Sequence, residues 1–125
     1  MKSLRVLVAD DNPVNLKIMV SALRGLGHTG VIVKDGEKAV RCWSESSFDL
    51  VLLDVSMPVM DGLQALAIIR QKEKLGARHT PVLMVTAHDL PSDVEKFLRA
   101  GADGNVAKPV DIALLDAEIR RVLAV

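Results

Sequence analysis

The chain has 125 residues, half of them hydrophobic, and its 16 basic and 16 acidic residues cancel. This length suits one domain spanning residues 1–125, and the apolar content excludes a disordered segment. The balanced charge argues against binding to nucleic acid or anionic lipid, and no apolar stretch is long enough to be inserted in a membrane. The single cysteine, Cys42, has no partner for an internal disulfide, so we expect a reducing, cytoplasmic location.

Short apolar runs alternate with segments of helical spacing along the whole chain. The apolar runs predict strands at residues 4–9, 31–33, 50–53, 82–85 and 105–107. Helices are expected from Pro13 to about residue 25 and over residues 37–45, 63–74, 92–100 and 112–123. Five strands alternating with five helices predict an α/β fold, in which a parallel sheet carries helices on both faces and the crossovers are right-handed.

The helix starts carry recognisable capping residues. Asp11 or Asn12 can cap the first helix, with Pro13 at its first position, and Asp111 can cap the last. The segment from Ser92 to Glu95 fits a capping box for the fourth helix.

The central run, residues 50–53, is four apolar residues without alternation, followed by Asp54 and a loop that contains Pro58 and Gly62. An unbroken run of this kind is typical of a strand buried on both faces. Asp54 would then lie at the carboxyl end of the sheet, where open α/β folds bind ligands. Taken alone, Asp54 would suit a helix cap or a turn equally well.

Polar residues end four of the predicted strands: Asp10 and Asp11, Asp54, Thr86 and Lys108. In a parallel sheet these ends share one edge, so three carboxylates, a hydroxyl and an ammonium would meet there. Two like charges about 5 Å apart repel by roughly 3 kcal/mol at an effective dielectric near 20, so Lys108 alone would not neutralise the group. Oxygen ligands of this type suit Mg²⁺, which in turn binds phosphate oxygens. The pattern predicts a magnesium site where a carboxylate nucleophile can accept a phosphoryl group.

The sequence also contains the segment Met57-Pro58-Val59-Met60-Asp61-Gly62 and the pairs Thr86-Ala87 and Lys108-Pro109. With these features and the polar strand ends, the chain resembles the receiver domain of the two-component response-regulator family over essentially its full length. The resemblance implies the flavodoxin-like, doubly wound five-stranded sheet with strand order 2-1-3-4-5. It also implies that the module catalyses only its own phosphorylation and dephosphorylation and is otherwise not an enzyme.

The resemblance assigns a role to each site residue. Asp54 would accept a phosphoryl group from a phosphohistidine. Asp11, Asp54 and the backbone carbonyl of Ser56 would bind Mg²⁺ directly, and Asp10 would bind it through water. Lys108 would pair with one phosphoryl oxygen, and Thr86 would donate a hydrogen bond to another. The Lys108-Pro109 bond would be cis.

The segment from Asp10 to Asn15 resembles receivers attached to hybrid sensor histidine kinases, so we expect a histidine kinase or a histidine phosphotransfer domain as partner and phosphorelay signalling as the role. A downstream protein effector is a further expected partner. The family places residues that modulate phosphate lifetime at positions held here by Ser56 and His88. One departure is Asn105, where the family usually has an aromatic residue that couples to the hydroxyl of the site.

Three other functions fit parts of the pattern. A haloacid-dehalogenase-type phosphatase also uses an aspartyl-phosphate, but it requires a second Asp two residues after the nucleophile, where this chain has Ser56. A receiver-like interaction scaffold that is never phosphorylated would have no reason to keep mutually repelling carboxylates. A flavin carrier of the same fold would need a phosphate-binding Ser/Thr/Gly-rich loop after the first strand.

Overall fold

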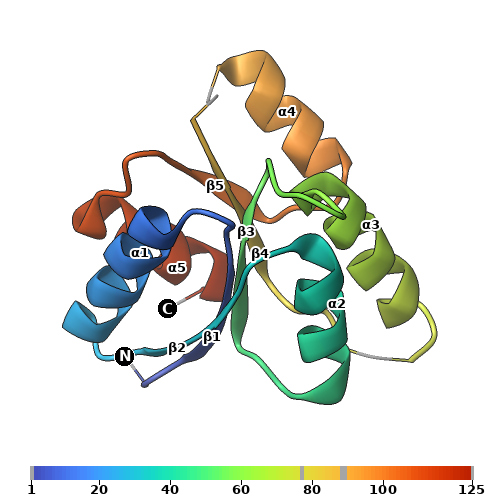
Figure 1. The fold of residues 1–125 in the computed structure, drawn as a ribbon, viewed down its shortest axis with the longest axis horizontal. Helices are drawn as coiled ribbons and strands as arrows, with labels where there is room; N and C mark the ends of the chain where they lie inside the picture. The colour runs from blue at the N-terminus through green and yellow to red at the C-terminus, as the bar shows by residue number, and fades with distance from the viewer. Residues whose placement is uncertain (1, 77, 88–89, 125) are drawn as a thin grey trace.

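The structure is a computed structural model that describes residues 2–76, 78–87 and 90–124. Figure 1 shows strands and helices in strict alternation. The strands are β1 (Arg5–Ala9), β2 (Thr29–Val33), β3 (Leu50–Asp54), β4 (Val82–Thr86) and β5 (Gly104–Ala107). The helices are α1 (Pro13–Gly25), α2 (Gly36–Glu45), α3 (Gly62–Glu73), α4 (Pro91–Arg99) and α5 (Ile112–Leu123).

The strands form one parallel sheet in the order β2-β1-β3-β4-β5, which confirms the predicted flavodoxin-like topology. The register aligns the carboxyl ends of the central strands. Ala9 of β1 lies beside Leu53 of β3, and Asp54 lies beside Val85 of β4. At the next pair, Thr86 lies beside Ala107 of β5. The residues that end these strands are therefore neighbours across the sheet.

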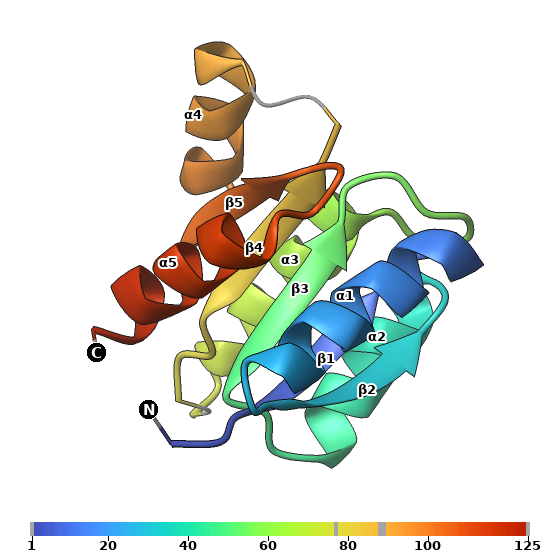
Figure 2. The ribbon, with the colours of Figure 1, turned by 90° about the vertical axis from the view of Figure 1, so that its left-hand side faces the viewer.

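The central strand β3 separates two apolar cores. Its residues alternate between the faces, as the period of a strand requires. Val51 and Leu53 pack into the core under α2 and α3, whereas Leu50 and Leu52 pack into the core under α1 and α5. Figure 2 shows α1 and α5 in front of the sheet, with α2 and α3 behind it. All four side chains are fully buried, which explains the apolar run without alternation.

Helix capping agrees with the prediction at α1 and α5 and departs from it at α4. Asn12 and Asp111 cap α1 and α5 as predicted, and Asp35 caps α2. A capping box is present at α3, between Asp61 and Gln64. The capping box predicted from Ser92 to Glu95 is wrong. Helix α4 begins at Pro91, which suits the first helical position, and its N-cap, Leu90, makes no side-chain hydrogen bond.

Helix α4 has less buried surface than the other helices. Phe97 is its one buried residue, and Figure 1 shows the helix standing out beside the β5 edge of the sheet. The last helix also differs from its sequence pattern at one position, because Ile112 is 47% exposed although its spacing predicts a core position. Within the described residues, no helix combines the length and the apolar character needed to cross a membrane.

Candidate functional site

The carboxyl edge of the sheet collects the polar residues predicted from the sequence. Asp10 and Asp11 directly follow β1, and Asp54 is the last residue of β3. Thr86 is the last residue of β4, and Lys108 directly follows β5. The parallel register brings these strand ends together, and β1, β3 and β4, which position Asp10, Asp54 and Thr86, are buried in the two cores.

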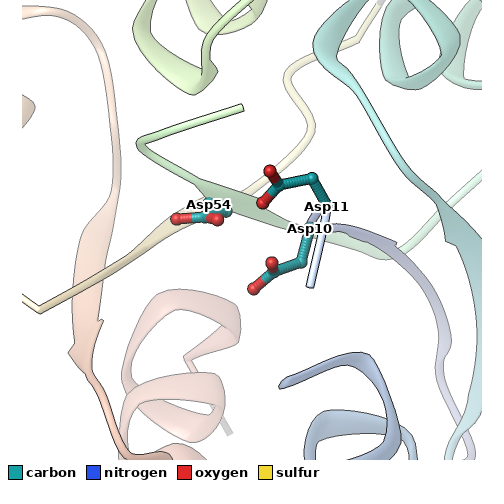
Figure 3. A group of neighbouring side chains, drawn as sticks. All are labelled: Asp10, Asp11 and Asp54. Atoms are coloured by element: carbon teal, nitrogen blue, oxygen red, sulfur yellow. The ribbon is translucent and has the colours of Figure 1, made fainter. Parts of the chain in front are cut away.

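The three carboxylates form one cluster. Asp10, Asp11 and Asp54 each place an oxygen within 4.8 Å of the others. Figure 3 shows the carboxylate of Asp11 extending toward Asp54, with that of Asp10 beneath it. Asp10 is fully buried and Asp54 is 3% exposed, whereas Asp11 is exposed. The cluster is therefore buried on the side of Asp10 and Asp54 and open to solvent on the side of Asp11.

Lys108 is the cation of the cluster. Its Nζ lies 2.9 Å from Oδ1 of Asp54 and 3.4 Å from Oδ2 of Asp10. Its backbone N–H donates to the carbonyl of Thr86 at 2.8 Å, which fixes the residue beside the end of β4. The Lys108-Pro109 peptide bond is cis, as the resemblance implied.

Burial and charge shift the pKa values of both members of this ion pair. Burial, helped by the neighbouring charge of Asp10, raises the pKa of the Asp54 carboxyl, although the hydrogen bond from Lys108 opposes the shift. Burial lowers the pKa of Lys108, but its hydrogen bond and charge interaction with Asp54 outweigh that effect, so its pKa is raised overall. The hydrogen-bonded ion pair thus favours the ammonium form of Lys108, whereas burial makes the Asp54 carboxylate more basic.

The cluster has the donor set of a hard-cation site. One ammonium faces three carboxylates, and Oδ2 of Asp10 is buried without a hydrogen-bond partner among the described residues. Its one ion-pair contact among the described residues is the 3.4 Å approach of Lys108, and buried polar atoms are normally hydrogen-bonded, so this oxygen can accept a further ligand, water or ion. Oxygen atoms within 4.8 Å of one another suit Mg²⁺ or Ca²⁺, which take oxygen ligands. The residues present therefore fit a divalent cation.

Ser56 and Thr86 lie next to this cluster as expected. The backbone N–H of Ser56 donates to Oδ1 of Asp54 at 3.3 Å, so the chain turns tightly after β3. Thr86 is 3% exposed at the end of β4. Asn105 is half-buried within β5, where it lies beside Met84. The prediction for His88 lies outside the described residues.

Two glycines hold the loop after Asp54 in place, and the sequence indicated only turns at these positions. A Cβ atom on Gly62 would lie 2.1 Å from the backbone oxygen of Asp54, so α3 can begin here only with glycine. A Cβ atom on Gly36 would lie 2.2 Å from the carbonyl oxygen of Met60, which accepts the Gly36 N–H at 2.9 Å. The loop is thereby fixed to the starts of α2 and α3.

The burial of His28 was also not foreseen. It is 3% exposed, and its Nδ1 accepts the backbone N–H of Leu4 at 3.1 Å. Its Nε2 has no partner among the described residues. The position is part of the turn after α1, and no periodic signal marks it as buried.

Comparison with known proteins places this geometry in a family. A family model described as the response regulator receiver domain matches residues 6–120. Hybrid signal transduction histidine kinase I of Dictyostelium discoideum is 40% identical over 116 residues, which is 89% of this chain and 7% of that protein. The chain thus spans only a small part of this relative.

Solved structures agree with this result. One is the receiver domain of sensor histidine kinase PA1611 from Pseudomonas aeruginosa, which is described with a magnesium ion coordinated in its active-site cleft. It is 35% identical to this chain with a TM-score of 0.87, and the alignment covers 99% of this chain and 100% of that chain. The receiver domain of Ssk1 from Saccharomyces cerevisiae, described in complex with the histidine phosphotransfer protein Ypd1, aligns with a TM-score of 0.87 at 29% identity, over 94% of this chain and 87% of that chain. The five-stranded fold, the matched residues and these relatives show that the chain belongs to the response regulator receiver domain family.

Proposed function

We propose that residues 1–125 act as a single phosphoacceptor module in which Asp54 takes a phosphoryl group from a phosphohistidine and Lys108 stabilises the product. The observation that carries the proposal is the position of the Asp54 carboxylate. It lies at the end of a buried strand, 2.9 Å from the Lys108 ammonium and within 4.8 Å of the carboxylates of Asp10 and Asp11. Positioning and charge neutralisation are the main requirements of phosphoryl transfer.

In the proposed step, a carboxylate oxygen of Asp54 attacks the phosphorus atom. The new O–P bond forms as the P–N bond to the imidazole breaks, and the imidazole nitrogen takes up a proton from solvent. The raised pKa of Asp54 favours attack, since it indicates a more basic oxygen. After transfer, Lys108 would pair with a phosphoryl oxygen in place of the carboxylate, and the Thr86 hydroxyl would donate a hydrogen bond to another.

We propose Mg²⁺ as the cation of the site. Asp11, Asp54 and the carbonyl of Ser56 would bind it directly, and Asp10 would bind it through water. The buried Oδ2 of Asp10, whose one ion-pair contact among the described residues is Lys108 Nζ at 3.4 Å, and the oxygen-only donor set support this assignment. When bound, the ion neutralises charge on the phosphoryl oxygens and on the carboxylates.

A histidine kinase or a histidine phosphotransfer domain is the proposed donor or acceptor of the phosphoryl group. Two observations support a protein partner. The relatives include a hybrid kinase and a receiver described in complex with Ypd1. In addition, exposed apolar side chains lie close in sequence to the site residues, with Val14 65% and Ile112 47% exposed. Beyond its own phosphorylation and dephosphorylation, we expect no further catalysis by the domain.

Intact-mass spectrometry after incubation with Mg²⁺ and acetyl phosphate tests the proposal. We expect the native chain to gain one phosphoryl group and Asp54→Asn to gain none. Glu45→Gln, which changes an exposed acid at the end of α2, is the matched control and should be phosphorylated like the native chain. Phosphorylation of Asp54→Asn at the native level would contradict the assignment. A native chain that binds Mg²⁺ but accepts phosphate from neither acetyl phosphate nor a phosphorylated phosphotransfer protein would favour the scaffold function instead.

A further inference from the structure

A second polar cavity lies at the opposite edge of the sheet, where the strands begin. It has a volume of about 360 Å³ and lies between the end of α2, the segment before β3 and the segment before β4. Figure 2 shows these connections at the lower end of the sheet, away from the end of β3 that carries Asp54. The volume lies at the lower end of the range of small-molecule sites in proteins.

Hydroxyl groups in this cavity have protons without an acceptor among the described residues. The Thr80 hydroxyl, in a residue only 7% exposed, accepts the indole N–H of Trp43 at 3.0 Å, so its own proton remains to be donated. The hydroxyl of Ser46 accepts a hydrogen bond from Arg5, and its proton likewise has no acceptor among the described residues. Ser47 contributes a further hydroxyl to the lining. A ligand that brings acceptor oxygens would complement these groups.

Two cations complete the polar lining. Lys72 at the end of α3 and Arg78 before β4 both line the cavity, and neither forms an ion pair with a described residue. None of the described residues that line the cavity is acidic. Unpaired cations beside free hydroxyl donors match the charge and the acceptor-rich oxygens of phosphate.

Apart from Ser44, whose hydroxyl donates to the carbonyl of Arg41, the remaining wall of the cavity is apolar. It comes from Trp43 and Phe48, which belong to the core under α2 and α3. This wall can contact an organic group while the cations and hydroxyls bind the charge. Small-molecule sites usually combine apolar walls with a few polar groups in this way. We propose that this cavity binds a small organic phosphate monoester, through Lys72, Arg78 and the hydroxyls of Ser46, Ser47 and Thr80.

The chain contains a built-in reporter for this site. Trp43 is the only tryptophan, and its indole N–H is bonded to Thr80, so a ligand that engages the Thr80 hydroxyl should change the tryptophan fluorescence. The test titrates AMP, glycerol 3-phosphate and inorganic phosphate into the full chain without Mg²⁺ and at constant ionic strength. Adenosine and glycerol are the phosphate-free controls, and amide NMR shifts of residues 46–48 and 80 provide a second readout.

We expect AMP or glycerol 3-phosphate to give a saturable change, which adenosine and glycerol do not give. Lys72→Gln and Arg78→Gln should each weaken binding by about tenfold, since each removes one charge-assisted contact. Lys74→Gln is the matched control because Lys74, an exposed cation two residues from Lys72, does not line the cavity. Asp54→Asn should bind like the native chain, which separates this site from the proposed phosphorylation site.

Three outcomes would overturn the proposal. The first is the absence of any saturable change with either ester up to about 10 mM, the range of weak metabolite binding. The second is binding that Lys72→Gln and Arg78→Gln leave unchanged, which would refute the two cations as ligands of the phosphate group. The third is equal affinity for inorganic phosphate and both esters, which would refute the role of the apolar wall. None of them bears on phosphorylation of Asp54.

Discussion

The two ends of the sheet hold charged clusters that differ in how fully their polar atoms are hydrogen-bonded. At the carboxyl end, Asp10, Asp11 and Asp54 cluster, and among the described residues the one cation paired with them is Lys108, which contacts Asp10 and Asp54. At the other end, Arg70 of α3 lies between the carboxylates of Glu73 and Asp103. His79 also contacts both carboxylates, and we call these four residues the Arg70 network.

The Arg70 network is saturated with hydrogen bonds. Arg70 donates to Glu73 at 2.7 Å, to Asp103 at 2.9 Å, and to the backbone carbonyls of Gly101 and Thr80 at 2.8 and 2.9 Å. The carboxylates also accept backbone N–H groups at the start of β4. The carboxylate site, by contrast, leaves Oδ2 of Asp10 without a hydrogen-bond partner among the described residues. The Arg70 network thus has the hydrogen bonding of a structural cluster, whereas the carboxylate site keeps acceptor capacity for the proposed cation.

The largest effect is expected from breaking the Arg70 network. Arg70→Ala would leave Glu73, whose side chain is 8% exposed, and Asp103 without their cation, and we expect a loss of about 4 kcal/mol in unfolding free energy. Urea denaturation measures the loss. Arg120→Ala, which breaks the more exposed pair with Asp116, is the matched control and should cost under about 1 kcal/mol. Equal losses for the two variants would show that the network adds nothing to stability.

The carboxylate site is held by backbone packing rather than by paired charges, and Gly62 tests this. In Gly62→Ala the added methyl would meet the Asp54 carbonyl at 2.1 Å, so α3 or the loop must shift, at a cost of about 2 kcal/mol. We also expect slower phosphorylation by acetyl phosphate, because Asp54 moves with its carbonyl. Gly30→Ala is the control, since its methyl would make only ordinary contacts from 3.6 Å. Native rates and native stability in Gly62→Ala would contradict the close packing.

A smaller effect of opposite sign is expected from removing charge at the carboxylate site. Without metal, Asp54→Asn should be more stable than the native chain by about 1 kcal/mol, the size of one partly screened repulsion between like charges. Mg²⁺ at ten times its Kd should stabilise the native chain by about 1.4 kcal/mol. This gain should be largely lost in Asp54→Asn. Melting curves with and without Mg²⁺ measure both effects, and identical native curves would refute the metal site.

The smallest effect concerns pH and the buried imidazole of His28. Burial lowers the pKa of His28 below its ordinary value, so the unfolded chain binds a proton that the folded chain does not. Stability from this group is therefore lost as the pH falls through about 6.5, the pKa of an exposed histidine. Urea denaturation at pH 7.5 and 5.5 should show a larger loss for the native chain than for His28→Asn. An equal loss in both would mean that His28 does not carry the effect.

The alternation of elements and the residues of the carboxylate site could be predicted because strand ends and apolar runs are local signals, whereas the strand order came from the resemblance to the receiver family. Asp54 and Lys108 are far apart in sequence, yet the parallel register alone brings their strands' ends to one edge. The Arg70 network could not be predicted, since the pairing of Arg70 with Asp103 depends on how the start of β5 packs against α3. The roles of Gly36 and Gly62 depend on close backbone approaches that no sequence pattern reports.

Helix α4, anchored through Phe97 and without a side-chain N-cap, has a consequence for the dynamics of the domain. Its local unfolding would expose one large core side chain, whereas opening α1 or α3 would expose several. Amide hydrogens of α4 should therefore exchange with solvent earlier than those of the other helices.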